Sequence, residues 1–93
     1  MAALLSLQER EALRATLTHW QVGDERLKRQ WQFSDFSEAF AFMTRVALLA
    51  ESKQHHPNWS NVYNRVTIEL TTHDLGGLSN LDAELARSID ALQ

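Results

Sequence analysis

The stretch Trp59-Ser-Asn-Val-Tyr-Asn-Arg-Val-Thr-Ile-Glu-Leu-Thr-Thr-His73 contains the alternation that decides the fold. Apolar residues occupy every second position at Val66, Ile68 and Leu70, and polar residues stand between them. Because successive side chains of a strand point to opposite faces, this pattern is typical of a strand with one buried face. We therefore predict a hairpin, with strands at residues 59–63 and 66–73 and a turn at Asn64-Arg65.

A second hairpin is predicted upstream of this one. Leu27, Arg29, Trp31 and Phe33 share one side of an extended segment whose other side is uniformly polar, and Arg29 is the one charged residue on the otherwise apolar side. Gly23-Asp24 separates this segment from residues 20–22, as expected for a short turn between two strands. Two tight hairpins favour an antiparallel sheet.

Three helices flank the hairpins. The first follows Ser6 and Glu9, which have capping-box spacing, and reaches about residue 18. The second covers residues 34–53 and is expected to be the central buried helix, because it is apolar over most of its circumference. Its expected apolar stripe is Phe36, Phe40, Met43, Ala47 and Ala50, and Phe42, Val46 and Leu49 widen it. The third helix is capped by Ser79 and Asp82, which also have capping-box spacing, and its apolar stripe runs to residue 92.

The predicted order of elements is α-β-β-α-β-β-α, an α+β fold in a single domain over residues 1–93. Helices that cover the apolar face of the sheet would bury it. The other face would stay open to solvent, a ligand or another subunit.

The composition excludes several classes of protein. Hydrophobic residues make up 44% of the chain and charged residues 23%, values that exclude wholesale disorder. The net charge of −3 lacks the basic field that binding to a nucleic acid duplex or an anionic membrane needs. The absence of cysteine excludes disulfides, thiolate metal sites and a cysteine nucleophile. The first apolar run is too short for a signal peptide or a membrane span, so we expect a cytoplasmic protein.

Three of the four histidines, His55, His56 and His73, lie close together in the sequence. An unperturbed imidazole has a pKa of about 6.5 and can exchange a proton near neutral pH. Pro57 favours extended geometry at His56, so the two neighbouring imidazoles should diverge. Surface histidines are common, and on composition alone a solvated loop is the alternative interpretation.

The residues around these histidines suggest two further kinds of site, a metal site and an aromatic platform. His55 and His73 could be combined with Glu51 or Asp74 as zinc ligands. Neighbouring residues rarely bind one ion and no HExxH-like pair is present, so we expect no metal. Two tryptophans, Trp20 and Trp59, could offer flat surfaces to a planar ligand, although filling the core is their more common role.

Six residues stand at a characteristic spacing: Glu51, His55, Pro57, Tyr63, His73 and Asp82. In this spacing, and in the His-His-Pro sequence, residues 20–90 resemble the pterin-4a-carbinolamine dehydratase family. The resemblance implies a four-stranded antiparallel sheet with three helices packed on one face. It also implies a hydro-lyase that removes water from a 4a-hydroxytetrahydropterin to give the quinonoid dihydropterin. Aromatic amino acid hydroxylases reuse that product after its reduction.

The resemblance further implies roles for individual residues. His55 and His73 would be the acid–base pair, and His56 would orient the pterin. The other implied substrate-binding residues are Gln54, Thr71, Thr72, Asp74, Glu51 and Trp20. Gln54 departs from relatives that carry aspartate there, which removes one charge beside His55. No redox step occurs, so neither a metal nor a nucleotide cofactor is required.

The alternative is a module without catalysis, which binds pterins or a protein partner. Family members also act as dimerisation partners of a homeodomain transcription factor, and a pterin-salvage role on a molybdenum cofactor precursor would use the same pocket. The complete set of three histidines favours retained activity. The expected partners are the pterin substrate, further copies of the chain in a homo-oligomer and, functionally, an aromatic amino acid hydroxylase. No direct binding to nucleic acid or membrane is expected.

Overall fold

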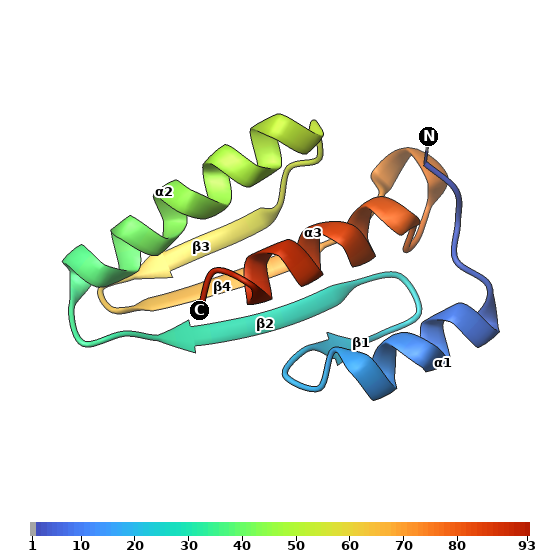
Figure 1. Ribbon diagram of the computed structural model, residues 1–93, viewed down its shortest axis with the longest axis horizontal. Coiled ribbons are helices and arrows are strands. Elements are labelled where there is room, and N and C mark those ends of the chain that lie inside the picture. The colour runs from blue at the N-terminus through green and yellow to red at the C-terminus, as the bar shows by residue number, and fades with distance from the viewer. Residues whose placement is uncertain (1) are drawn as a thin grey trace.

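The computed structural model describes residues 2–93 and confirms the predicted α+β fold (Figure 1). The elements, in chain order, are α1 (Leu7–Thr16), β1 (Gln21–Val22), β2 (Leu27–Gln32), α2 (Phe36–Lys53), β3 (Asn58–Val62), β4 (Arg65–Leu70), the 3₁₀ turn η1 (His73–Leu75) and α3 (Asn80–Asp90). Within residues 2–93, no helix is both long and apolar enough to cross a membrane.

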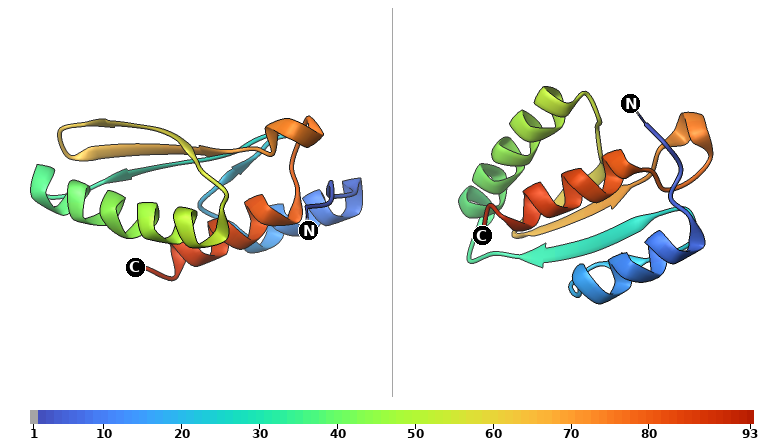
Figure 2. Two further views of the ribbon diagram at one scale, coloured as in Figure 1. Left: turned by 90° about the horizontal axis from the view of Figure 1, so that it is seen from above. Right: turned by 45° about the vertical axis from the view of Figure 1, so that its right-hand side comes forward.

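The four strands form one antiparallel sheet in the order β1-β2-β4-β3. The long pairing between β2 and β4 joins the two predicted hairpins and aligns Leu27 with Leu70 and Trp31 with Val66. These side chains are buried, as the alternation in the sequence predicts. All three helices lie on the same side of the sheet (Figure 2, left), which leaves the second face uncovered.

The helix at the centre of the layer is α3, and the prediction that α2 would be central is wrong (Figure 1). The α2 residues that face the core are Ala39, Phe42, Val46 and Ala50. Phe36 and Phe40, which were expected in the apolar stripe, are 47% and 56% exposed. The sequence pattern could not separate these faces, because α2 is apolar on both and each has helical spacing.

The second hairpin differs from its prediction at both ends. Its turn is centred on Tyr63-Asn64, one residue earlier than expected, and Tyr63 has a positive φ of 51°. β4 ends at Leu70, so His73 begins the turn η1 and does not stand at the end of a strand. The backbone N–H of Thr72 donates to the carbonyl of Gly77 and closes a loop around η1.

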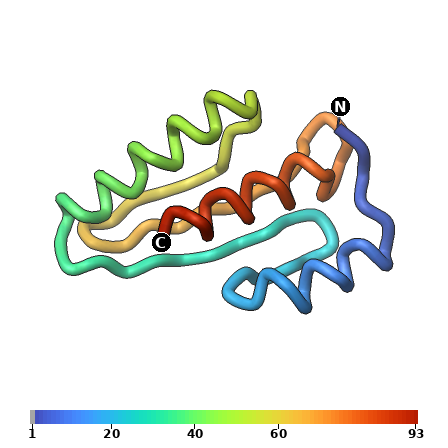
Figure 3. Tube along the Cα trace, in the orientation of Figure 1, coloured from blue at the N-terminus to red at the C-terminus, as the bar shows by residue number. Residues whose placement is uncertain are grey.

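The chain before α1 runs alongside the loop that leads into α3 (Figure 3). Leu4 forms an antiparallel bridge with Ser79, and the N–H of Leu5 donates to the carbonyl of Leu78 at 2.9 Å. Two segments that lie far apart in the sequence, the one before α1 and the one before α3, therefore meet at the beginning of α3.

Candidate active site

A pocket of about 560 Å³ opens where the end of α2, the turn η1 and the beginning of α3 meet. Its lining residues are Ala2, Gln54, His55, His56, Thr71, Thr72, His73, Asp74, Leu75 and Leu81. The structure thus brings all three clustered histidines to one cavity. Its volume lies within the range of pockets that enclose small ligands.

The end of α2 directs the two neighbouring histidines apart. Gln54 has a left-handed conformation with φ of 50°, which ends the helix, and the N–H of His55 returns to the carbonyl of Ala50 at 3.1 Å. His55 is consequently buried, whereas His56 is exposed. The predicted divergence of the two imidazoles is confirmed.

The imidazole of His55 is held by a buried carboxylate on α3. Nε2 of His55 lies 2.5 Å from Oδ1 of Asp82, and the Asp82 side chain has no exposure to solvent. The other carboxylate oxygen, Oδ2, accepts hydrogen bonds from the hydroxyl of Thr72 and from the N–H of Ser79, each at 2.8 Å. The Thr72 and Ser79 hydroxyls are themselves 2.5 Å apart. Both oxygens of Asp82 are therefore occupied by donors.

This network determines which nitrogen of His55 carries a hydrogen. The hydrogen bonds from Thr72 and Ser79 both end on Oδ2, and an ionised carboxylate only accepts hydrogen bonds, so we assign the hydrogen of the contact with Oδ1 to Nε2 of His55. In the neutral ring, Nδ1 then carries the lone pair. An imidazole fixed in this way presents Nδ1 as the nitrogen that can take up a proton and return it.

The second and third histidines are more accessible. Nε2 of His56 lies 2.9 Å from Oε1 of Glu51, one turn earlier on α2, and both side chains are largely exposed. Glu51 does not itself line the pocket, but it contacts His56, which does. His73 is exposed at the first position of η1, next to Asp74. The Thr71 hydroxyl donates to the carbonyl of Glu25 at 2.7 Å, which ties this rim to the first hairpin.

The structure does not bring Trp20 into this pocket. Trp20 is 5% exposed, and its Nε1–H donates at 2.9 Å to Asp90 at the far end of α3. Asp82 and Asp90 are eight residues apart, or about 12 Å along a helix. Trp59 does not line the pocket either, since it packs against the hydrophobic core. Both tryptophans therefore follow the core-filling interpretation.

Some contributors to the pocket had no signal in the sequence. Ala2, Leu75 and Leu81 line it, but none belongs to a recognisable motif. The sequence predicts a helix-capping role for Asp82, and Asp82 does complete a capping box with Ser79. The same carboxylate also binds His55, and only its place in the family spacing pointed to a further role.

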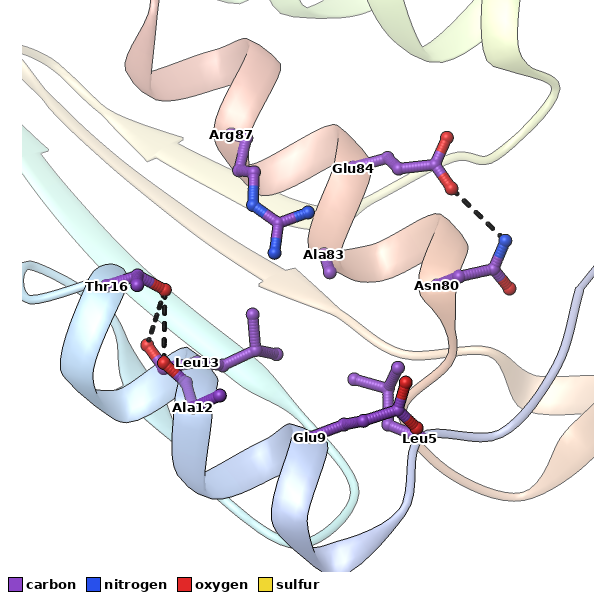
Figure 4. Close-up of a pocket in the computed structure, with 9 residues that line it drawn as sticks. All are labelled: Leu5, Glu9, Ala12, Leu13, Thr16, Asn80, Ala83, Glu84 and Arg87. Atoms are coloured by element: carbon purple, nitrogen blue, oxygen red, sulfur yellow. Dashed lines mark hydrogen bonds between the residues drawn. The ribbon is translucent and has the colours of Figure 1, made fainter.

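A second cavity, of about 290 Å³, lies between α1 and α3 (Figure 4). Leu5, Leu13 and Ala83 contribute apolar side chains to it, and its charged groups are Glu9, Glu84 and Arg87. None of its described lining residues is a histidine, so it offers no imidazole for proton transfer. Within residues 2–93, no three His, Cys, Asp or Glu side chains are arranged to hold a metal ion.

Comparison with known proteins places the chain in a family. Residues 3–92 match the family described as pterin 4 alpha carbinolamine dehydratase. A protein of Synechococcus sp. (strain WH7803), named "Putative pterin-4-alpha-carbinolamine dehydratase", is 79% identical over 92 residues, which are 99% of each chain. A protein of the same name from Prochlorococcus marinus (strain MIT 9303) is 55% identical over 92 residues, or 99% of this chain and 96% of the relative.

Two solved structures have the same architecture. A transcriptional coactivator/pterin dehydratase from Brucella melitensis superposes with a TM-score of 0.89 at 42% identity, covering 96% of this chain and 97% of that one. A pterin dehydratase-like protein identified as a RuBisCO assembly factor in the alpha-carboxysome gives a TM-score of 0.64 at 27% identity, covering 78% and 84%. The fold and the histidine pocket define a pterin dehydratase-type protein. The chain belongs to the pterin-4a-carbinolamine dehydratase family.

Proposed function

We propose that this protein removes water from a 4a-hydroxytetrahydropterin by general acid–base catalysis in the histidine pocket. The observation that carries the proposal is the convergence of His55, His56 and His73 on one cavity, with His55 oriented by the buried Asp82. Membership of the family supplies the pterin as the substrate class.

The reaction needs two proton transfers at the reduced pterin ring. The bond between C4a and its hydroxyl breaks, and the departing oxygen takes up a proton and leaves as water. The proton on N5 is removed, and its electron pair forms the C4a=N5 double bond of the quinonoid product. One group must therefore donate a proton and another must accept one, and each such transfer typically contributes 10²- to 10⁴-fold in rate.

His55 and His73 are the proposed donor and acceptor. They reach the cavity from different elements, His55 after α2 and His73 from η1, which suits action on two positions of a planar ring. The Nδ1 atom of His55 is the nitrogen available for the transfer, because Nε2 is bonded to Asp82. Which of the two histidines is the acid stays open in this proposal.

The remaining polar lining residues are proposed to hold the substrate. Gln54, His56, Thr71 and Asp74 surround the cavity and can supply donors and acceptors to the amino-pyrimidinone edge of a pterin. Glu51 would orient His56 from outside the pocket, and the Thr72 hydroxyl would hold Asp82. Reduction of the product would return it to a pterin-dependent hydroxylase of aromatic amino acids.

We also propose that the protein is a homo-oligomer. Phe36, Phe40 and Leu48 expose apolar side chains on α2, and Val62 and Tyr63 do so at the neighbouring hairpin. A patch of this kind on a small domain supports self-association. β3 is the last strand on its side of the sheet, which leaves an edge that a further strand could pair with.

The second candidate function is that of an interaction module that binds pterins without catalysis. The apolar surface of α2 and the coactivator and assembly-factor descriptions of the two solved relatives favour it. The deciding experiment follows the loss of a freshly generated 4a-hydroxytetrahydropterin by ultraviolet absorbance, with and without protein. Acceleration above the spontaneous rate supports the dehydratase. Pterin binding without acceleration would instead favour the interaction module.

A further inference from the structure

The segment before α1 is fixed against the beginning of α3. The N–H of Ala3 donates to Oδ1 of Asn80 at 2.8 Å, and the N–H of Asn80 returns to the carbonyl of Ala3 at 3.2 Å. The N–H of Leu5 donates to the carbonyl of Leu78 at 2.9 Å, and Leu4 bridges Ser79. Chain segments outside regular elements commonly fray unless they are tied down in this way. Residues 3–5 are tied down at three successive positions.

This segment also reaches the histidine pocket. Ala2 lines the cavity together with His55, His73 and Leu81, whereas its neighbour Ala3 is exposed and does not line it. Ala2 is followed directly by Ala3 and Leu4, which pair with Asn80 and Ser79. These two partners lie at the beginning of α3, just before Asp82. The same short stretch therefore borders the substrate cavity and is anchored to the element that orients His55.

We infer that Ala2, held in place by the anchored residues 3–5, forms a fixed part of the wall of the substrate pocket, and that its small side chain determines which ring substituents the pocket admits. The inference rests on the proposed function, because it takes the ligand to be a pterin. A fixed wall cannot swing away from a bulky ligand, so a larger side chain at position 2 removes volume from the cavity. Alanine at this position leaves space for a substituent on the pterin ring.

The test uses two stable oxidised pterins that differ only at ring carbon C6. One is pterin itself, without a side chain, and the other is biopterin, which carries a dihydroxypropyl chain. Their dissociation constants are measured by equilibrium dialysis for the native protein, Ala2→Trp and Ala3→Trp. Ala3→Trp is the matched control, since it adds the same indole one residue away, outside the cavity. Circular dichroism verifies the fold of each variant.

If Ala2 forms part of a fixed wall, Ala2→Trp should raise the dissociation constant of biopterin by about tenfold, a steric penalty typical of a well-defined pocket. The dissociation constant of pterin should rise much less. Ala3→Trp should bind both ligands as the native protein does. If Ala2→Trp perturbs the fold, Ala2→Val should give a smaller loss with the same preference for pterin. Native binding of biopterin by Ala2→Trp, equal weakening of both ligands, or the same loss in Ala3→Trp would each overturn the inference. Failure of the native protein to bind either pterin would overturn the proposed pterin function itself, together with the inference.

Discussion

Nε2 of His55 lies 2.5 Å from Oδ1 of Asp82, and both residues are buried. His55 follows the end of α2 and Asp82 stands in the first turn of α3, so the contact joins two elements that are 27 residues apart in sequence. The remaining oxygen of Asp82 accepts from Thr72 and Ser79. A buried carboxylate with this many donors orients its imidazole firmly, which is the geometry that proton transfer requires.

Replacement of Asp82 by asparagine should impair catalysis but leave substrate binding largely intact. Its amide oxygen would accept from Thr72 and Ser79, so its NH₂ group would face Nε2 of His55 and force the ring hydrogen onto Nδ1. We expect Asp82→Asn to lower kcat by about 10²- to 10⁴-fold, the contribution of one proton-transferring group. KM should change far less, and the dehydration assay measures both constants.

The control for this variant is Glu84→Gln. It makes the same change of carboxylate to amide two residues further along α3, on an exposed side chain. We expect Glu84→Gln to keep the native kcat. A folded Asp82→Asn protein with native kcat would show that the orientation of His55 by Asp82 is not needed for the reaction.

Thr72→Val should destabilise the fold through the same network. Valine has the shape of threonine but no hydroxyl, so Oδ2 of Asp82 loses one donor and the hydrogen of the buried Ser79 hydroxyl loses its acceptor, while the Ser79 oxygen still accepts from the N–H of Leu81. The free energy of unfolding should fall by about 1–3 kcal/mol, the cost of leaving a buried polar group unsatisfied. Urea denaturation followed by circular dichroism measures it.

Thr71→Val serves as the comparison, because the Thr71 hydroxyl donates to Glu25 at an exposed position where water can replace it. Its free energy of unfolding should stay close to the native value. If Thr71→Val and Thr72→Val lowered the free energy of unfolding equally, burial of the Thr72 hydrogen bonds would not be the cause of the loss.

Trp20→Phe should affect stability and leave pterin binding intact. The variant keeps an aromatic ring in the core but loses the hydrogen bond from Nε1 to Asp90, so we expect a loss of about 1–3 kcal/mol in the free energy of unfolding. His56→Gln is expected to weaken pterin binding and to leave the free energy of unfolding unchanged, because His56 is exposed at the pocket. Weaker pterin binding by a stable Trp20→Phe protein would return Trp20 to the substrate site that the family resemblance implies.

If the exposed aromatic residues of α2 hold the proposed oligomer together, replacing them should lower the molecular mass of the particle in solution. Phe36→Ser combined with Phe40→Ser removes two apolar rings that are about half exposed, so the protein should dissociate into smaller species in analytical ultracentrifugation. Leu7→Ser is the control, since Leu7 is also exposed but lies on α1. The expectation of an oligomer is wrong if the native protein sediments as a monomer at micromolar concentration.

Local patterns predicted most of the fold. The alternation around Val66, Ile68 and Leu70 marks β4, and the capping boxes at Ser6 and Ser79 mark the beginnings of α1 and α3. Each of these signals involves residues that contact one another within a few positions in the sequence. The two faces of α2 could not be told apart in this way, because the choice between Phe40 and Phe42 depends on what packs against the helix.

The pocket is built by contacts between residues that are far apart in the sequence. Local patterns therefore could not predict all of the residues that form it. Asp82 looks like a cap until α3 is placed against the end of α2, where His55 lies. Ala2 lines the cavity next to Ala3, which is paired with Asn80, 77 residues later. The three histidines were predicted as a group because they already stand close together in the sequence.

We propose that His55 and His73 perform the two proton transfers of the dehydration. The most direct test measures the initial rate of loss of 4a-hydroxytetrahydropterin with the native protein, His55→Ala and His73→Ala, each corrected for the spontaneous reaction. We predict that the native protein accelerates the loss and that each variant lowers kcat by about 10²- to 10⁴-fold while still binding pterin. No acceleration by the folded native protein, or a native rate in either variant, would contradict the account.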